Sequence, residues 1–399
     1  MELLDTKTKN TILKTMMELL DVNRAAIIEA NQRDVELFKG GDQAMMDRLI
    51  VNNAKVDGMI QAVKEIMEKP DPVDQVISEM LREDGLKIIN KTAPFGTIMI
   101  IYESRPDVTI EASVLAIKAN NKIILKGGKE AKNSNLKLVE LWHKALALND
   151  LEEDWIDYLN LPREEVQQFL KKPDRPIDLI APRGGERLIN FVKEHATCPV
   201  LVSGRGNNFL FVDEKADWEK AKQVIINAKR DKISACNALD KVFFHASLPD
   251  LASKLKELQA ALQDAKVQIL GDEHVAKQLD GVESIMDEEI WYEEFLELKI
   301  VLGVVDNLFE AIEKINQYSG GHSSSIITED ALSAGAFMQQ VDSGAVYHNA
   351  STRFTDGGQM GVGAELAIST DKLHHRGPLG LEQLVTNKYY VYGDGHVRV

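Results

Sequence analysis

The amino-acid sequence predicts a mixed α/β protein built on parallel sheets. Three observations support this prediction: short apolar runs typical of buried strands alternate with amphipathic helical patterns, glycine-containing turns separate many of them, and the order strand, helix, strand recurs along the 399 residues. Strands joined through a helix are expected to lie parallel, with right-handed crossovers. A chain of this length usually exceeds one hydrophobic core, so we expect two or three structural units.

Helices come before the strands in the first part of the chain. Apolar side chains recur at helical spacing in three segments between residues 7 and 66, and Pro70 closes the pattern. Two β-rich runs then flank a Pro-Phe-Gly break inside 85–104, followed by a helix over 108–121 and a strand over 122–128. This order predicts the first parallel pair of strands.

The pattern repeats further along the chain. Residues 176–196 predict a short strand, a glycine turn and an amphipathic helix, and 198–213 are expected to continue as strands. A second α/β block follows, and the tail at 387–395 is a strand with no evident partner. The elements expected in the second block are a helix over 216–230, strands at 242–245, 267–270 and 299–306, and a helix over 308–318.

Composition and charge exclude several classes of protein. The 63 acidic and 47 basic residues give a net charge of -16, which opposes binding to nucleic acid or an anionic membrane surface. Two cysteines in the whole chain exclude a disulfide framework and indicate a reducing compartment. The polar start "MELLDTKTKN" does not resemble a secretory signal, and no apolar run is long enough to span a bilayer. We therefore expect a cytoplasmic protein.

Cys236, in the stretch "KISACNALDKVF", is a candidate nucleophile. A thiolate attacks acyl carbon readily, and it forms at neutral pH beside positive charge or a helix N-terminus. The amide of Asn237 is placed to point at a carbonyl oxygen. On residue type alone, a buried core cysteine is the more common alternative, and that reading is kept for Cys198. The basic side chains just upstream of the candidate are Lys229, Arg230 and Lys232.

Two glycine pairs follow predicted strands. In "IAPRGGE" a strand ends at Gly184-Gly185 and a helix begins, which leaves backbone amides and the positive end of the helix dipole available to a phosphate. In "ILKGGKE" the side chain of Lys126 stands at a strand end, where an ammonium suits a phosphate or ribose. A plain turn and a solvated loop lysine are the alternatives, since neither segment is a GxGxxG fingerprint.

The stretch from 349 to 370, "NASTRFTDGGQMGVGAELAIST", combines small hydroxyl residues, an arginine and four closely spaced glycines. Such a loop offers amides and a guanidinium to a carboxylate. The histidines form no metal set, because His374 and His375 are adjacent and neither an HExxH nor a paired-cysteine spacing occurs. We expect no metal site.

Taken in this order, these segments resemble the gamma-glutamyl phosphate reductases of the aldehyde dehydrogenase superfamily. The resemblance runs through nearly the whole chain. The segments that carry it are "YESRPDVTIEAS", "IILKGGKEAKNSN", "IDLIAPRGG", "SACNA", "GGHSSSIITED" and, with the highest specificity, "NASTRFTDGGQMGVGAELAISTDKLHHRGPLGLEQL".

The resemblance implies an aldehyde dehydrogenase-like α/β fold of three parts. A Rossmann-type NADP(H)-binding domain is expected over 1–82 and 97–212, with a returning segment at about 364–385. A catalytic α/β domain is expected over 213–363. A small β oligomerisation flap, formed by 83–96 and 386–399, is expected to give the C-terminal strand its partner in another subunit of a homodimer or homotetramer.

It also implies an activity: NADPH-dependent reduction of L-glutamate 5-phosphate to L-glutamate 5-semialdehyde and phosphate through a cysteine thioester, with possible channelling from glutamate 5-kinase. The residues that the resemblance assigns are, for catalysis, Cys236 as nucleophile and Asn237 beside the oxyanion; for the cofactor, Lys126, Gly127, Gly128, Arg183, Gly184 and Gly185, with Glu293 or Glu294 near the nicotinamide ribose; and for the substrate, Ser351, Thr352 and Arg353 at the glutamyl end and Arg105 near its anionic groups.

The chain differs from the usual family pattern in places. Asp107 replaces an amide by an acid, 207–209 read Asn-Asn-Phe, and Asp231 precedes the nucleophile. Aldehyde-oxidising relatives carry a glutamate that activates water, where this chain has Val202 and Ser203, which suits a reductase. Another NAD(P)-dependent aldehyde dehydrogenase or acyl-phosphate reductase, and a non-catalytic paralogue, remain the alternatives.

Overall fold

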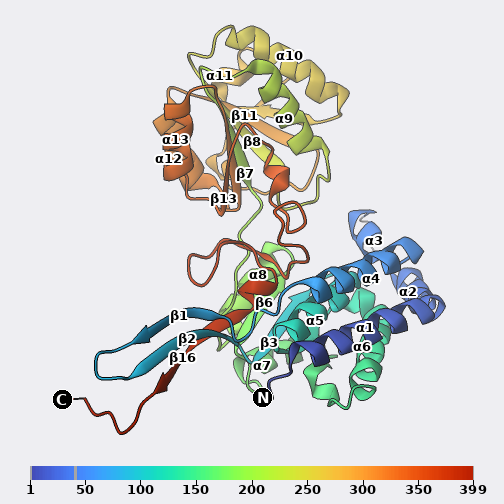
Figure 1. Ribbon diagram of the computed structural model, residues 1–399. Helices are drawn as coiled ribbons and strands as arrows, with labels where there is room; N and C mark the ends of the chain where they lie inside the picture. The colour runs from blue at the N-terminus through green and yellow to red at the C-terminus, as the bar shows by residue number, and fades with distance from the viewer. Residues whose placement is uncertain (1, 40–42, 399) are drawn as a thin grey trace. The chain divides into compact units, whose positions relative to one another are not determined.

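The computed structural model describes residues 2–39 and 43–398, which form two compact units (Figure 1). Unit 1 comprises Met1–Val202, Gly361–Ala367 and Pro378–Val399, and unit 2 comprises Ser203–Met360 and Ile368–Gly377. Each unit contains its own parallel sheet, so the α/β prediction is confirmed.

The predicted N-terminal helices are present in unit 1. Their apolar faces, which include Met16 of α1 and Val63 of α4, are fully buried in the core of this unit. Asp5 and Asn52 explain where two of them start, because each side chain accepts a hydrogen bond from a backbone N–H of the first turn. Among the described residues, no helix is long and apolar enough to cross a membrane. The helices are α1 (Thr6–Val22), α2 (Arg24–Leu37), α3 (Gln43–Leu49) and α4 (Asn53–Glu68).

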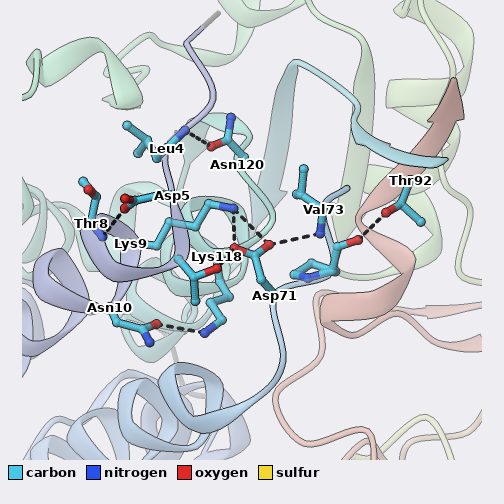
Figure 2. Close-up of polar contacts among 12 residues, drawn as sticks. Leu4, Asp5, Thr8, Lys9, Asn10, Asp71, Val73, Thr92, Lys118 and Asn120 are labelled. Carbon is cyan, nitrogen blue, oxygen red and sulfur yellow. Dashed lines mark hydrogen bonds and ion pairs between the residues drawn. The ribbon is translucent and has the colours of Figure 1, made fainter. Parts of the chain in front are cut away.

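A buried ion pair ties the first helix to the segment that follows α4 (Figure 2). The side chain of Lys9 is 1% exposed, and its Nζ lies 2.8 Å from a carboxylate oxygen of Asp71. The same carboxylate accepts hydrogen bonds from the hydroxyl of Thr6 and the backbone N–H of Val73. A buried charge needs partners of this kind, so Asp71 fixes the chain where it leaves the helices.

The sheet of unit 1 has the order β5-β4-β3-β6, and all its strands are parallel. The chain moves outward from β3 to β4 and β5, then returns to the other side of β3 for β6, which creates a topological switch point between β3 and β6. The carboxyl ends of these four strands therefore bring the loops that follow them to one edge. The elements are β3 (Thr97–Tyr102), α5 (Asp107–Lys118), β4 (Lys122–Lys126), α6 (Lys132–Ala147), β5 (Ile156–Tyr158), α7 (Arg163–Lys171), β6 (Leu179–Arg183) and α8 (Glu186–His195).

The C-terminal strand pairs within its own chain. A three-stranded antiparallel sheet has the order β1 (Val76–Leu81), β2 (Lys87–Pro94) and β16 (Val385–Tyr392). Tyr389 stands opposite Asn90 in this register. No partner for this strand was evident within the chain from the sequence, but β2 supplies one, and β16 forms one edge of this sheet. We refer to these three strands as the β-arm.

Unit 2 contains a parallel sheet of order β10-β9-β11-β8-β7-β12-β13. Strand β7 lies inside this sheet, so residues 203–212 belong to unit 2 and not to the first domain as expected. The strands are β7 (Asn208–Val212), β8 (Leu239–His245), β9 (Gln268–Gly271), β10 (Glu283–Ser284), β11 (Lys299–Val305), β12 (Ser323–Ile327) and β13 (Ala345–His348), and the helices are α9 (Trp218–Arg230), α10 (Leu251–Asp264), α11 (Glu273–Ala276), α12 (Leu308–Tyr318) and α13 (Ala331–Gln340).

The segment expected to continue as strands at 198–213 is strand only in its second half. Before β7 it makes a single bridge, between Val200 and Ile180, and Cys198 lies outside any strand. Glycines at 204 and 206 in this segment approach other backbone too closely for a side chain, which favours an irregular path. The remaining short pair is β14 (Ile368–Ser369) with β15 (Gly377–Pro378).

Candidate active site

Cys236 lies in a turn at the amino edge of the unit 2 sheet, between α9 and β8. It is exposed, whereas the next two residues are buried. The alternative of a buried core cysteine is therefore wrong for Cys236. Cys198 is half-buried, and burial raises the pKa of its thiol, which suits a structural residue.

The basic residues upstream of Cys236 have separate roles. Lys229 is fully buried, and its Nζ lies 2.9 Å from a carboxylate oxygen of Asp240, so its charge is paired within the core. Burial lowers the pKa of Lys229, and Asp240 opposes that shift. Arg230 and Lys232 are exposed, and Lys232 has a positive φ of 48°, which is unusual for a residue with a side chain.

The side chain of Asn237 connects two segments. One is the turn at 231–238 that contains Cys236, here called the nucleophile turn, and the other is the stretch at 349–370, here called the glycine-rich loop. Nδ2 of Asn237 donates to the carbonyl oxygens of Arg353, at 3.2 Å, and Thr355, at 2.9 Å. The carbonyl of Asn237 in turn accepts from the hydroxyl of Thr352 at 2.8 Å. The side-chain amide, which we expected to face the substrate, is thus used inside the protein. The backbone N–H is the other donor of this residue.

The glycine-rich loop presents one guanidinium beside this turn. Ser351 caps the short 3-10 helix Thr352–Phe354, and Thr352 is fully buried. Arg353 is largely buried; its Nη2 lies 3.3 Å from Asp231, while Nε and Nη1 are buried and make no hydrogen bond among the described residues. Of the three substrate residues predicted here, Arg353 therefore has two buried nitrogens whose N–H groups make no hydrogen bond among the described residues.

Glu294, rather than Glu293, lies next to the nucleophile turn. A methyl group on Gly206 would stand 2.1 Å from the carbonyl oxygen of Cys236 and 2.6 Å from a carboxylate oxygen of Glu294. Both groups therefore pack against Gly206, a residue that the sequence analysis did not identify. Its signal in the sequence was the "GRGNN" turn before β7, which lacks a distinctive pattern.

A buried lysine supports the loop that carries Glu294. Nζ of Lys241 donates to the carbonyl of Glu293 at 2.7 Å and to the side-chain oxygen of Asn207 at 3.0 Å, and lies 3.8 Å from the ring centroid of Phe295. Burial lowers the pKa of Lys241 to about 7. Asn207 also donates to the carbonyl of Trp291 at 2.6 Å, so the loop is held at several points.

In unit 1, Lys126 ends β4 and faces its own loop. Nζ donates to the carbonyl of Gly127 at 2.8 Å, and burial lowers the pKa of Lys126 although Glu130 opposes the shift. Gly127 and Gly128 pass close to Asn135 and Glu130, with no room for a side chain at either glycine. The tight Gly-Gly turn therefore brings backbone to the carboxyl edge of the sheet.

The Gly184-Gly185 turn begins α8 at the same edge. The backbone N–H of Gly185 donates to a carboxylate oxygen of Glu103 at 3.3 Å. The guanidinium of Arg183 points elsewhere: Nη1 donates to the carbonyl of Glu365 at 3.1 Å. The helix start thus already receives an anionic group, as its dipole favours.

Arg105 stands in an ionic cluster at the start of α5. Its Nη2 lies 3.5 Å from Asp107, whose carboxylate also lies 3.8 Å from Nζ of Lys55. Burial would lower the pKa of Arg105, but Asp107 and Glu111 outweigh it and raise the pKa. Two cations, Arg105 and Lys55, therefore balance the charge of Asp107. Within the described residues, no cluster of histidine, cysteine and carboxylate side chains is arranged to hold a metal ion.

Comparisons with known proteins agree over nearly the full length. Residues 1–290 match the aldehyde dehydrogenase family. The gamma-glutamyl phosphate reductase of Persephonella marina is 42% identical over 98% of this chain and 90% of its own length. The crystal structure of the gamma-glutamyl phosphate reductase from Thermotoga maritima is 43% identical, with a TM-score of 0.95, and covers 99% of this chain and 95% of that one.

More distant structures share the fold alone. An engineered glycolyl-CoA reductase with bound NADP+ is 16% identical, with a TM-score of 0.67, over 98% of this chain and 90% of its own.

Proposed function

Because the chain belongs to the aldehyde dehydrogenase family, and within it to the gamma-glutamyl phosphate reductases, we propose that it reduces L-glutamate 5-phosphate to L-glutamate 5-semialdehyde and phosphate with NADPH, the second step of proline biosynthesis. The observation that carries the proposal is the exposed Cys236, which stands in a turn whose buried neighbours are hydrogen-bonded to the glycine-rich loop.

Cys236 is the nucleophile in this proposal. Its thiolate attacks the acyl carbon, the bond to phosphate breaks, and phosphate leaves with the electron pair, so that a thioester forms on the sulfur. NADPH, when bound, supplies the hydride that reduces this thioester. Collapse of the resulting thiohemiacetal anion releases the aldehyde and expels the thiolate of Cys236. Val202 and Ser203 carry no base that would direct water to the thioester, which favours reduction over hydrolysis.

The substrate is held in this proposal by two arginines. The unused Nε and Nη1 of Arg353 suit the α-carboxylate of the glutamyl group, since a guanidinium N–H forms a strong, charge-assisted hydrogen bond with a carboxylate oxygen. Arg105 suits the acyl phosphate. Ser351 and Thr352 support Arg353 by holding the loop, because their hydroxyls are engaged with backbone atoms.

The residues at the carboxyl edge of the unit 1 sheet fit a nicotinamide dinucleotide. Such ligands bind at a topological switch point, and here the switch lies between β3 and β6. The N–H of Gly185 donates to the carboxylate of Glu103, which supports the start of α8 as the place where a pyrophosphate would bind. The ammonium of Lys126 suits a phosphate or a ribose of the cofactor. Glu294 would bind the nicotinamide ribose.

Assembly is proposed through the β-arm, which we expect to join chains into a homodimer or homotetramer. The arm exposes several apolar side chains, which favours contact with another protein surface. Channelling from glutamate 5-kinase, which makes the labile acyl phosphate, belongs to the same proposal. The exposed apolar residues of the arm are Val76, Ile77, Met80, Leu81, Tyr389, Val391 and Tyr392.

The reverse reaction tests the function without the labile substrate. Purified protein is mixed with pyrroline-5-carboxylate, phosphate and NADP+ or NAD+, and reduced cofactor is followed by absorbance. We expect a phosphate-dependent signal that is larger with NADP+, is abolished in Cys236→Ala, and is kept in Cys198→Ser. A signal that does not need phosphate would indicate another aldehyde dehydrogenase, and folded wild type without any signal would indicate a non-catalytic paralogue.

A further inference from the structure

Asn208 has all of its side-chain hydrogen-bonding groups directed at the protein around Cys236. It is the first residue of β7 and is fully buried. Its Nδ2 lies 2.8 Å from the carbonyl oxygen of Cys236, 2.6 Å from that of Ala238 and 2.8 Å from that of Gly206. Its Oδ1 accepts from the backbone N–H of Ser323 at 3.0 Å.

Each carbonyl oxygen from residue 235 to residue 238 accepts a hydrogen bond. The backbone N–H of Ala238 donates to the carbonyl of Ala235 at 2.9 Å, which closes the turn around Cys236. Thr352 holds the carbonyl of Asn237, and Asn208 holds the carbonyls on either side of it. No carbonyl from 235 to 238 is left to reorient toward water.

We propose that Asn208 is a positioning residue that fixes the peptide plane between Cys236 and Asn237 and the one between Ala238 and Leu239, and thereby the direction of the Cys236 thiol and of the Asn237 N–H. The peptide group is planar and trans, so the C=O of Cys236 and the N–H of Asn237 point in opposite directions. A hydrogen bond that fixes the first also fixes the second. The proposal rests on the thioester chemistry proposed above.

The chemistry of the side chain explains why an amide stands here. The NH2 group has two protons to share among three carbonyl oxygens, and the amide oxygen accepts from a fourth group. A hydroxyl or a thiol has a single proton, so it leaves at least one of the two turn carbonyls without a donor. The amide also carries no titrating proton, so this clamp does not change across the pH range in which a thiol ionises.

The position of the Cys236 sulfur matters because it can attack the acyl carbon only from a narrow range of directions. A displacement of about 1 Å in a reacting group costs about 100-fold in rate. The turn has two backbone hydrogen bonds of its own, from the N–H of Ala235 to the carbonyl of Lys232 and from the N–H of Ala238 to that of Ala235, each 2.9 Å long. Neither bond involves the carbonyl of Cys236 or Ala238, so the backbone of the turn sets no preferred direction for these two groups. The hydrogen bonds from Asn208 supply that preference.

Two variants and a control separate this role from a merely structural one. Asn208→Leu keeps the shape and removes every hydrogen bond, and Asn208→Ser keeps one donor. The control is Asn121→Leu in unit 1: Asn121 is also fully buried, donates to the carbonyl of Leu384 at 2.8 Å and accepts from Gly96 at 3.0 Å, at the amino edge of its sheet.

The measurements are the melting temperature, the rate of Cys236 alkylation by iodoacetamide between pH 6 and 9 with Cys198 as internal reference, and kcat and KM of the reverse reaction per folded molecule. We expect kcat to fall about 100-fold in Asn208→Leu and about tenfold in Asn208→Ser, with KM within threefold. Alkylation of Cys236 at pH 7 should slow at least threefold, and the control should change neither quantity by more than about twofold.

The proposal is overturned if the Asn208 variants lose as much thermal stability as the control but keep Cys236 alkylation and kcat within twofold of wild type. If wild type has no reverse activity, the proposed function fails, and the alkylation rates alone decide the role of Asn208.

Discussion

The guanidinium of Arg353 faces the carboxylate of Asp231, with 3.3 Å between Nη2 and the nearer oxygen. Asp231 is 59% exposed, whereas Arg353 is 13% exposed, so the acid covers a buried cation from the solvent side. A substrate carboxylate that binds Arg353 has to compete with this internal acid.

Substitution of Asp231 by Asn should strengthen substrate binding. The neutral side chain no longer competes for Arg353, so we expect KM for pyrroline-5-carboxylate to fall about two- to fivefold with kcat within twofold, as for an exposed ion pair. Arg353→Gln should raise KM at least tenfold. Glu329→Gln, which removes the exposed pair between Lys220 and Glu329, is the control. An unchanged KM in Arg353→Gln would show that this arginine does not bind substrate.

We expect the carboxylate of Glu103 in the wild-type protein to weaken the binding of NADPH. Its carboxylate receives the N–H of Gly185 at the start of α8, where a pyrophosphate is proposed to bind. Glu103→Gln removes a like charge from that position, and the dipole effect at a helix end corresponds to about a two- to fivefold lower dissociation constant for NADPH. Isothermal titration calorimetry at two salt concentrations measures this dissociation constant for the wild type and the variant. Weaker binding in the variant would mean that Glu103 itself contacts the cofactor.

We expect His322 to lower the stability of unit 2 at acidic pH. It is fully buried beside Ser323, and burial lowers the pKa of its imidazole to about 4. The unfolded chain binds the proton near pH 6.5, so stability present above that pH is lost as the pH falls toward 4, by roughly 3 kcal/mol. Hydrogen exchange of β12 peptides at pH 7 and pH 4, corrected for intrinsic rates, should show this loss in wild type and a much smaller one in His322→Gln.

Gly206 should tolerate no side chain. The added methyl group of Gly206→Ala would lie 2.6 Å from Cα of Cys236, so the nucleophile turn has to move. We expect kcat to fall at least about 100-fold. Gly335→Ala is the matched control, because a methyl group there meets nothing within 4 Å and alanine favours the interior of α13 by about 0.5–1 kcal/mol. Equal activity of the two variants would contradict the close packing at Gly206.

Short-range patterns in the sequence predicted most of the secondary structure. The helices before Pro70, the parallel pair of strands around α5, and the strand and glycine turn before α8 all follow from apolar periodicity and from local breaks. The strand expected before residue 206 is absent, because the apolar residues 200–202 lie in an irregular segment that precedes Gly204 and Gly206. Periodicity reports burial, and burial alone does not require a strand.

The sequence by itself determined the α/β class, the family and the candidate nucleophile, since these depend on patterns within a few tens of residues. Only the tertiary structure decided the partners of these groups: β16 pairs with β2, Arg353 faces Asp231, and Asn208 holds the carbonyls of Cys236 and Ala238. Hydrogen bonds between residues far apart in sequence depend on direction and distance in space. A linear pattern of residue types carries neither.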